Sequence, residues 1–498
     1  MTPIEREFVQ RVNRIPYHGL GLSVDVYQPD LFELAAELHR RGLDYGYLEI
    51  FKAAPAALES VRRRLPDSLF AYHAEGLWVT QPHPERLSPF HAELDDTAEQ
   101  LRILGSHWLN HECAAKQMAG YAFGTYLPAL FTAASAEVTA ENIAQAQQRL
   151  DRSRAAQDGM GPLFLLETPP LTYMGFGDLS MAEFFRLVTD RTPCGLVLDI
   201  GHLWTVYRYT GEWRRRSLTS FLADLLDAFP LERVVEIHMA GLAPHPGVPL
   251  EREAGSPPLW IDAHGAPIPE VLADMLAQVL EHDGLTRLKG VALEVDTKPI
   301  SMIVEEFSRA QERFGMPCSK FEASRKFEVR GSTFDVESHT VNFERRTSQK
   351  PRTSNLSSLA GQYDRYAQIV TGRATDGLPV LGQDASALPL YVDHYLPHEI
   401  LEWGGVVRDM FPDTCRNLDR AGIPLNGFVH FWFREPREMN GSGQAYDFFL
   451  LKVARFVDFV REVLPNVSEA AEREATALRE GYQAACEQVG TESLTVNR

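Results

Sequence analysis

Short apolar runs alternate with amphipathic stretches from residue 18 to about residue 315 of this chain. An apolar run of about four to eight residues is typical of a strand buried on both faces, as in a parallel sheet. Each run therefore predicts a strand. The eight runs are GLGLSVDV (19–26), LDYGYLEI (43–50), SLFAYH (68–73), HWLNHE (107–112), GPLFLLE (161–167), GLVLDIGH (195–202), RVVEIH (233–238) and GVALEVD (290–296).

The stretches between these runs have helical spacing and helix-start signals. DLFELAAELHRRG opens with Asp30 and Glu33, a capping-box pattern, and stops at Gly42, while SMAEFFRLVTDR opens with Ser180 and Glu183. TAENIAQAQQRLDRSRAA and IPEVLADMLAQVLEH show the same periodicity. Eight strands alternating with helices over about 250–300 residues predict an α/β fold of the TIM type, a (β/α)8 barrel. The alternative, a doubly wound open sheet, would place its site at one switch point of the sheet.

The last third of the chain differs from the barrel in composition and in its pattern of apolar residues. Residues 318–357 are polar, partly alternating and basic at their end, which predicts a linker or a hairpin arm after a barrel domain at 1–317. Residues 358–498 are expected to form a mainly helical, aromatic-rich domain, because GQAYDFFLLKVARFVDFVREVL carries one apolar helical stripe. We interpret its aromatic residues as a small helical core. A peptide-binding or barrel-capping surface is the second interpretation.

Composition limits the partners and the compartment. The 498 residues carry 49 Lys and Arg against 68 Asp and Glu, a formal net charge of −19 that disfavours a nucleic-acid partner. The N-terminal MTPIEREFVQRVNR lacks the apolar core of a signal peptide, and no run of about 18 apolar residues predicts a membrane span. Five scattered cysteines without a CxxC pair favour a reducing, cytoplasmic setting over disulfides or a structural zinc site.

Acids and histidines gather at the ends of the predicted strands. The carboxyl ends of barrel strands hold the active site in this fold, and carboxylates buried there are costly unless they are paired or bound to metal. No Lys or Arg adjoins them in the sequence. Five carboxylates and five imidazoles exceed the needs of one ion and suit two or three divalent cations. The predicted ligands are His73, His111, Glu167, Asp199, His202, Glu236, His238, Asp262, His264 and Glu294.

The donor types narrow the metal without selecting one. Imidazole and carboxylate without thiolate suit iron, zinc or manganese. The chain shows no GxGxxG after its first strand, no P-loop and no GxSxG elbow, so nucleotide-binding and serine-hydrolase functions have no support.

The motif series at the strand ends resembles a known family. YHAEG, FLLETPP, GLVLDIGH, VVEIHMAG, WIDAHGAP and ALEVD are similar to motifs of the multinuclear non-haem iron-dependent oxidases, TIM-barrel enzymes that modify ribosomally made peptides, as in methanobactin biosynthesis. The most specific part is EIHMAG followed by IDAHGAPI, since the family carries a similar EIHLAG and DTHDAPV pair. The resemblance covers about residues 18–315.

Carried over motif by motif, the resemblance implies an iron site. It implies that His73 and His111 are histidine ligands and that Glu167 is a ligand able to bridge two irons. Asp199, His238, Asp262, His264 and Glu294 would complete the cluster, and Glu236 matches a motif position as well. The family usually has Asn-Asn where this chain has Gly201-His202. That LDIGH form is similar to sugar isomerase and AP-endonuclease barrels, in which the histidine is a ligand.

The resemblance also implies an activity and partners. The expected enzyme holds two or three iron ions, Fe2+ or Fe3+, and uses O2 as a co-substrate to modify a side chain, often cysteine, of a precursor peptide. We expect Glu167, Asp199 and Glu294 to act in catalysis as well as in metal binding. Family members act with a small partner protein that presents the peptide, and residues 358–498 are a candidate for such a partner fused in cis.

Three other functions remain open from the sequence. A sugar isomerase or epimerase using zinc or manganese would take Glu167 and Glu294 as bases on either side of a metal-held keto-sugar, and His202 favours it. A zinc phosphodiesterase of the AP-endonuclease type would share the ligands but needs a basic surface, which the charge of −19 opposes. A metal-dependent binding scaffold without catalysis is the last.

Overall fold

The fold is described from a computed structural model of the chain. It covers residues 1–84, 90–245, 260–315, 353–383, 386–436 and 445–495. In the part of the chain described, no helix combines the length and apolar character needed to cross a membrane.

Eight parallel strands close into a barrel in the spatial order β1-β12-β9-β8-β7-β4-β3-β2. All eight predicted strands are present, so the TIM-type barrel is confirmed. Their order along the barrel, apart from the closing pair of β1 and β12, follows the chain, as right-handed βαβ connections require. The barrel strands are β1 (Gly19–Val24), β2 (Leu48–Phe51), β3 (Phe70–His73), β4 (Trp108–Glu112), β7 (Leu163–Glu167), β8 (Gly195–Asp199), β9 (Val234–Met239) and β12 (Gly290–Glu294).

Helices surround this barrel, and several of them begin at caps that the sequence shows. Ser180 and Glu183 form the expected capping box of α6, and Asp30 accepts hydrogen bonds from the N–H groups of Phe32 and Glu33 at the start of α2. The helices are α1 (Pro3–Val12), α2 (Leu31–Arg40), α3 (Pro55–Arg64), α4 (Phe90–Leu104), α5 (Ala133–Arg152), α6 (Met181–Thr189), α7 (Ile200–Tyr209), α8 (Leu218–Ala228), α9 (Glu270–Leu280) and α10 (Ile300–Phe314).

The amino-terminal half of the barrel interior is filled by apolar side chains. Helix α1 contributes Phe8 and Val12 to a buried cluster with side chains such as Trp108 and Tyr47 from the strands. Tyr47 has room because Gly21 faces its ring, and a Cβ added there would lie 2.4 Å from the ring. This end of the barrel is therefore a packed core, and the opposite end is left for chemistry.

Two small antiparallel sheets rise from the carboxyl end of the barrel. The first pairs β5 (Ala114–Met118) with β6 (Tyr121–Pro128), directly after β4. The second pairs β10 (Leu242–Pro244) with β11 (Trp260–Asp262), after β9. Both insertions follow barrel strands at their carboxyl ends, so they form part of the mouth.

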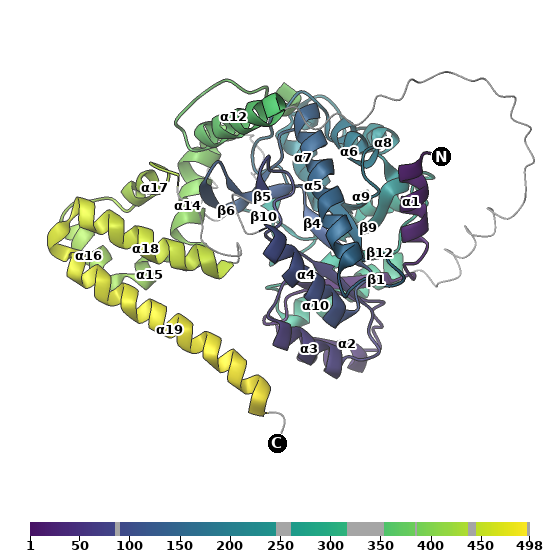
Figure 1. Ribbon diagram of the computed structural model, residues 1–498, viewed down its shortest axis with the longest axis horizontal. Coiled ribbons are helices and arrows are strands. Elements are labelled where there is room, and N and C mark those ends of the chain that lie inside the picture. The colour runs from purple at the N-terminus through teal and green to yellow at the C-terminus, as the bar shows by residue number, and fades with distance from the viewer. Residues whose placement is uncertain (85–89, 246–259, 316–352, 384–385, 437–444, 496–498) are drawn as a thin grey trace, which may run out of the picture.

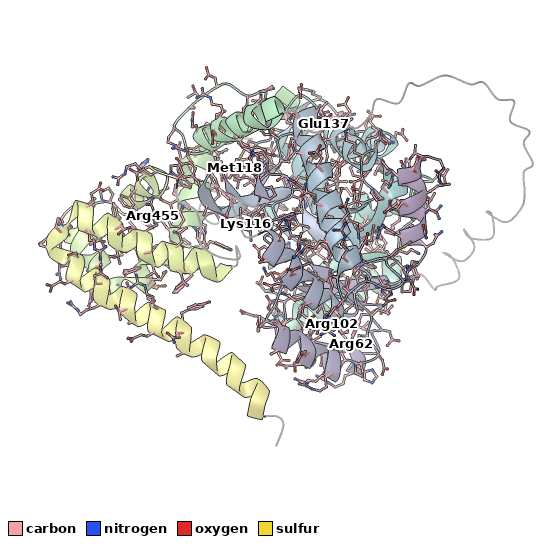
Figure 2. All side chains as sticks on the ribbon, in the orientation of Figure 1. Arg62, Arg102, Lys116, Met118, Glu137 and Arg455 are labelled. Atoms are coloured by element: carbon pink, nitrogen blue, oxygen red, sulfur yellow. The ribbon has the colours of Figure 1, made fainter. Side chains whose placement is uncertain are left out.

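The C-terminal third is helical and lies against one side of the barrel (Figure 1). Lys116 and Met118 of β5 lie between the barrel and these helices in Figure 2. The predicted linker or arm falls largely outside the described residues, and its last part, from Thr353, is the start of α12. The helices are α12 (Thr353–Val370), α13 (Leu388–Leu390), α14 (Leu396–Leu401), α15 (Val407–Met410), α16 (Pro412–Arg420), α17 (Asn426–Trp432), α18 (Ala445–Val463) and α19 (Ser468–Thr495).

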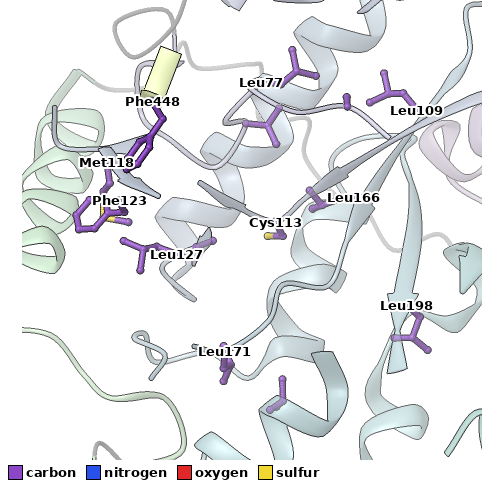
Figure 3. Packing of buried hydrophobic residues seen from close by; sticks show 14 of the residues in the cluster. Leu77, Leu109, Cys113, Met118, Phe123, Leu127, Leu166, Leu171, Leu198 and Phe448 are labelled. Atoms are coloured by element: carbon purple, nitrogen blue, oxygen red, sulfur yellow. The ribbon is translucent and has the colours of Figure 1, made fainter. Parts of the chain in front are cut away.

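Most of the described aromatic residues of the C-terminal third are buried, and Trp403, Phe449 and Tyr482 are partly buried. Phe428 and Trp432 are no more than 3% exposed and pack on one another at a ring distance of 5.8 Å. Figure 3 shows Phe448 of α18 directed at the β5–β6 hairpin, where a Cβ at Gly124 would lie 3.2 Å from its ring. The helical core and the barrel thus share one apolar interior.

Buried hydrogen bonds also join the two parts. Trp432 Nε1 donates to the carbonyl of Ala122 at 2.7 Å. The hydroxyl of Tyr363 on α12 donates to the carbonyl of Thr80 at 3.0 Å and lies 3.1 Å from the hydroxyl of Ser135. Such groups are costly to leave unpaired, so removal of the C-terminal region would damage the barrel itself.

Candidate metal centre

The side chains that point into the barrel at its carboxyl end are mostly acids and histidines. Strand alternation produces this arrangement, because residues two apart in a strand share a face. In β3, Ala71 belongs to the apolar interior and His73 is the next inward residue. In β7, Leu163 and Leu165 are interior and Glu167 follows. The upper inward layer comprises Ser23, Glu49, His73, Asn110, Glu112, Glu167, Asp199, His238 and Glu294.

A β-bulge determines which side chains of β9 face the barrel interior. The register with β8 shifts so that Leu196 pairs with Val234 while Val197 pairs with Glu236. Val235 lies in the barrel interior, and simple alternation from it would turn Ile237 inward and His238 outward. Because of the bulge, His238 faces the other inward residues.

Glu167 is at the centre of the cluster. Its Oε1 lies 3.3 Å from Nδ1 of His238 and 3.8 Å from Nδ1 of His202, and its Oε2 lies 3.4 Å from Nε2 of His73. The amide of Asn110 also donates to Oε2. Both carboxylate oxygens therefore face separate groups of potential ligands.

His238 links Glu167 to the rest of the barrel. Its Nδ1 lies 3.4 Å from Oε1 of Glu294, and its Nε2 lies 3.2 Å from Oε2 of Glu49 and 3.6 Å from Oε2 of Glu236. The imidazole is fully buried. Its two nitrogens consequently point at two different sets of carboxylates.

Loop and helix residues complete one side of the cluster. His202 lies in the first turn of α7, where Asp199 accepts a hydrogen bond from the His202 N–H at 2.6 Å as the helix cap. Nδ1 of His202 contacts the carbonyl of Thr168 at 2.5 Å, which directs Nε2 to Asp262 at 3.5 Å. Gly201 lies close beside them, and a Cβ there would be only 3.0 Å from Asp262 Oδ1.

His264 is held in the same way. Asp296 contacts its Nδ1 at 2.5 Å. Its Nε2 is then 3.1 Å from Oδ2 of Asp262 and 3.5 Å from Oε2 of Glu294. A carboxylate or carbonyl that fixes one ring nitrogen while the other faces the site is the usual surrounding of a metal-binding histidine.

The spacing of these atoms fits shared cations better than hydrogen bonds. Two atoms bound to one ion at about 2.1 Å lie about 3.0 Å apart at an octahedral angle and about 3.4 Å apart at a tetrahedral angle. The contacts of His238 with Glu167, Glu294 and Glu49 span 3.2–3.4 Å, yet neither ring nitrogen has a hydrogen-bond partner. Buried carboxylate oxygens of the cluster that also have no hydrogen-bond partner are Glu49 Oε1, Glu112 Oε2, Glu167 Oε1, Asp199 Oδ2, Asp262 Oδ1 and Glu294 Oε2.

The electrostatics show an excess of negative charge. Burial raises the pKa of Asp199 well above its usual range, an effect that Glu294 and Asp262 increase and His202 only partly offsets. Burial and the charge of Glu167 likewise raise the pKa of Glu112. Eight carboxylates meet four imidazoles here, so divalent cations would relieve the imbalance. The carboxylates are Glu49, Glu112, Glu167, Asp199, Glu236, Asp262, Glu294 and Asp296, and the imidazoles are His73, His202, His238 and His264.

The pKa values of His73 and Glu167 shift so that the charged form of each is favoured. Burial acts to lower the pKa of His73, but Glu167 and Glu49 raise it to about 9. Burial would raise the pKa of Glu167, yet the positive charges of His238 and His73 keep it well below its usual range.

Two predicted ligands are placed apart from this arrangement. His111 alternates with the inward residues of β4, and both of its nitrogens have partners: Nδ1 contacts the carbonyl of Glu112 at 2.8 Å, and Nε2 accepts from the Leu77 N–H at 3.2 Å. Burial accordingly lowers the pKa of His111 to about 4. The structure does not direct His111 at the cluster.

Glu236 lies one layer below the cluster. Its Oε1 accepts from the Tyr47 hydroxyl at 2.5 Å, and its Oε2 accepts from Trp108 Nε1 at 2.7 Å. Each oxygen keeps further lone pairs, and Oε2 is the one near His238. Glu236 therefore supports His238 from beneath, and its role as a ligand stays a prediction.

The structure adds residues that the predicted ligand set omits. Glu49, Asn110, Glu112 and Asp296 all face the cluster or fix one of its histidines. Glu49, Glu112 and Asp296 end apolar runs in the sequence, so the signal was present. Asn110 lies inside its run, and only the alternation of β4 from Trp108 could have shown that it points inward.

The chain is similar to several known proteins. A UPF0276 protein of Caulobacter vibrioides is 30% identical over 279 residues, covering 54% of this chain and 85% of its own length. A UPF0276 protein of Streptomyces avermitilis is 26% identical over 306 residues, covering 59% of this chain and 54% of its own length. Endonuclease IV from Thermus thermophilus is 19% identical with a TM-score of 0.37, over 62% of this chain and 99% of that chain. A TM-score this low carries no functional argument.

The family match covers most of the barrel. Residues 46–314 match the family described as RiPP precursor modification enzyme MbnB/TglH/ChrH, where RiPP denotes a ribosomally synthesised and post-translationally modified peptide. The matched residues include every member of the upper inward layer except Ser23, and they make up more than half of the 498 residues. The chain belongs to the MbnB/TglH/ChrH family of RiPP precursor modification enzymes.

Proposed function

We propose that this protein is a multinuclear iron oxidase that uses dioxygen to modify a side chain, cysteine being the expected one, of a ribosomally made precursor peptide. The family supports a peptide substrate. The buried histidines and carboxylates support a metal site, since their number and spacing exceed the needs of a single ion.

One observation carries the multinuclear part of the proposal. Glu167 belongs to three separate groups of residues whose donor atoms lie within 4.8 Å of one another: with His73 and Glu112, with His238 and Glu294, and with Asp199 and His202. A carboxylate shared among such groups is suited to bridge two cations.

The residues of the chain would divide the work as follows. Glu167 would hold the ions together with His73, His202, His238 and His264, whose imidazoles would supply nitrogen ligands. Asp199 Oδ2 and Glu294 Oε2 are buried oxygens without a hydrogen-bond partner, so they can bind an ion or receive a substrate proton. Bound iron would supply the activation of oxygen and the one-electron chemistry.

The barrel beneath the cluster shields this chemistry from water. Trp108 and Tyr47 close the interior immediately below Glu236 and are fully buried. A peptide side chain can therefore reach the cluster only from the mouth. Fixed ligands in a dry pocket strengthen each electrostatic contact with the reacting group.

We propose that the C-terminal helices help to form the peptide-binding mouth, in the place of a separate partner protein. The ring of Trp403 lies 5.0 Å from Nζ of Lys116, which also lies 4.3 Å from the ring of Tyr126 and pairs with Glu75 at 2.6 Å. Glu75 is two residues from His73. The wall above the cluster thus combines barrel residues with one from the C-terminal region.

A point variant tests this role better than a deletion, because the two parts share a core. Trp403→Ala should raise KM for the precursor peptide while leaving the metal content unchanged. Trp213→Ala, in the short 3-10 helix Glu212–Arg214 that follows α7, is the matched control and should leave KM unchanged. Equal KM values for all three proteins would remove the support for a shared mouth.

Anaerobic purification with metal quantification and Mössbauer or EPR spectroscopy tests the main proposal. We expect two or three irons per chain, spectroscopic coupling between them, and oxygen uptake on addition of a cysteine-containing precursor peptide. Tight zinc or manganese without oxygen uptake would favour instead the sugar isomerase or epimerase, in which Glu167 and Glu294 would act as bases.

A further inference from the structure

A second group of possible metal ligands lies outside the barrel cluster, where the C-terminal helices meet the mouth. His245 follows β10 on the barrel side, and His398 and Glu399 lie on α14. One donor atom from each lies within 4.8 Å of the other two. Helix α14 contacts β6 of the barrel hairpin, so the group spans the junction (Figure 1).

The rings are arranged as two imidazoles on one ion would be. Nε2 of His245 lies 3.0 Å from Oε1 of Glu399. The ring centres of His245 and His398 are 4.8 Å apart, with their planes perpendicular. Two imidazoles bound to one zinc at about 2.1 Å, at a tetrahedral angle, would place their ring centres about 5 Å apart.

Neighbouring residues hold the histidine of the barrel side in place. Tyr395 packs its ring on His245 at a centre distance of 3.9 Å, and its hydroxyl contacts that of Thr125 on β6 at 3.0 Å. His245 is only 3% exposed. The site therefore does not depend on long, mobile side chains.

The neighbouring cation, Lys452, is engaged by backbone groups. Its Nζ donates to the carbonyls of Trp403 and Gly405, and neither bond uses the carboxylate of Glu399. Glu399 is thus a mostly buried carboxylate, 12% exposed, whose closest partner is an imidazole.

We propose that His245, His398 and Glu399 bind one divalent cation that fastens the C-terminal helices to the barrel mouth. Two imidazoles and one carboxylate, with a fourth position for water, form a donor set that zinc accepts. The bound ion would join β10 to α14 and so fix the wall that faces the barrel cluster. This site is independent of the chemistry in the barrel.

Zinc counting on the full-length protein tests the proposal. Metal-stripped protein is equilibrated with zinc, freed of loose metal, and analysed for zinc per chain. His398→Gln should bind one zinc fewer than the unaltered protein and should lose part of the zinc-dependent rise in thermal midpoint. His398→Cys, which keeps a zinc ligand at this position, should restore the count.

His282→Gln is the matched control. His282 also pairs with a carboxylate, Asp227, at 3.2 Å, but it lies on the outer surface of the barrel. It should leave the zinc count unchanged. Equal counts for His398→Gln and the unaltered protein would overturn the site, and so would a loss that His398→Cys fails to restore. Equal thermal midpoints of the metal-free proteins show that the variants fold.

Discussion

Replacing Glu167 by glutamine should empty the barrel cluster, whereas the same change at Glu236 should not. Both side chains are 0% exposed and point into the barrel, and glutamine has nearly the shape of glutamate. They differ in their partners. Glu167 belongs to three possible ligand groups, whereas Glu236 shares one with Glu49 and His238. Both oxygens of Glu236 already accept hydrogen bonds, from Tyr47 and Trp108.

The structure gives the expected size of each effect. Loss of a supporting residue around a metal ligand lowers affinity by about 10- to 100-fold, so Glu236→Gln should stay loaded at metal concentrations well above Kd. The Tyr47 hydroxyl can rotate to accept from the new amide, which keeps Trp108 paired. Glu167→Gln removes one charge from two or more ions at once. We expect its metal content to fall from two or three ions per chain to fewer than one.

The assay is metal analysis after anaerobic reloading with Fe2+ and desalting. Circular dichroism and thermal midpoints of the metal-free proteins establish that both variants fold. A Glu167→Gln protein with full metal content would refute the bridging role and the site built around it. Equal depletion of Glu236→Gln would show instead that Glu236 is itself a ligand.

Three further outcomes follow from individual contacts. Tyr363→Phe should lower the free energy of unfolding by about 1–3 kcal/mol, because it leaves the Thr80 carbonyl without its donor. Tyr366→Phe on the same helix should lower it little, since that buried hydroxyl has no hydrogen-bond partner. Urea unfolding measures both variants, and equal losses would contradict the argument. Burial lowers the pKa of His18 to about 4, so as the pH drops from about 6.5 to 4 the unfolded chain binds this proton before the folded protein does, and stability falls. The variant His18→Asn can still donate to the Pro16 carbonyl and should reduce this loss of stability by up to about 3 kcal/mol. Unfolding curves measured across this pH range test the prediction, and an unchanged dependence of stability on pH would contradict it. Removing the metal with a chelator should lower the thermal midpoint, because an ion present at a free concentration 1,000 times its Kd stabilises the fold by about 4 kcal/mol. Metal-free protein that melts at the same temperature as the loaded protein would contradict a metal site in the core.

Much of the barrel and part of its site could be read from local pattern. Runs such as GPLFLLE and GVALEVD are apolar on both faces, which only a doubly covered strand requires, and each places an acid at its end. Glu167 and Glu294 could be predicted as site residues for that reason. Alternation could also have separated His111 from Asn110 and Glu112, because Trp108 faces inward.

The inward-facing residues of β9 could not be predicted from local sequence pattern. A bulge is a property of the pairing between two strands, and it turns both Val235 and His238 inward. The support of Glu236 by Tyr47 and Trp108 likewise joins residues 189 and 128 positions apart, which no local spacing reveals.

By itself, the sequence determined the strands, the barrel and the kinds of ligand at its mouth, because buried strands and buried acids constrain residue types locally. Only the tertiary structure decided which of those acids lie close enough to share an ion if one binds, that the aromatic C-terminal helices are part of the barrel's core, and that His245 meets His398 and Glu399. These facts depend on distances between segments far apart in the chain. Such distances are set by the closure of the barrel and the packing of the helices against it.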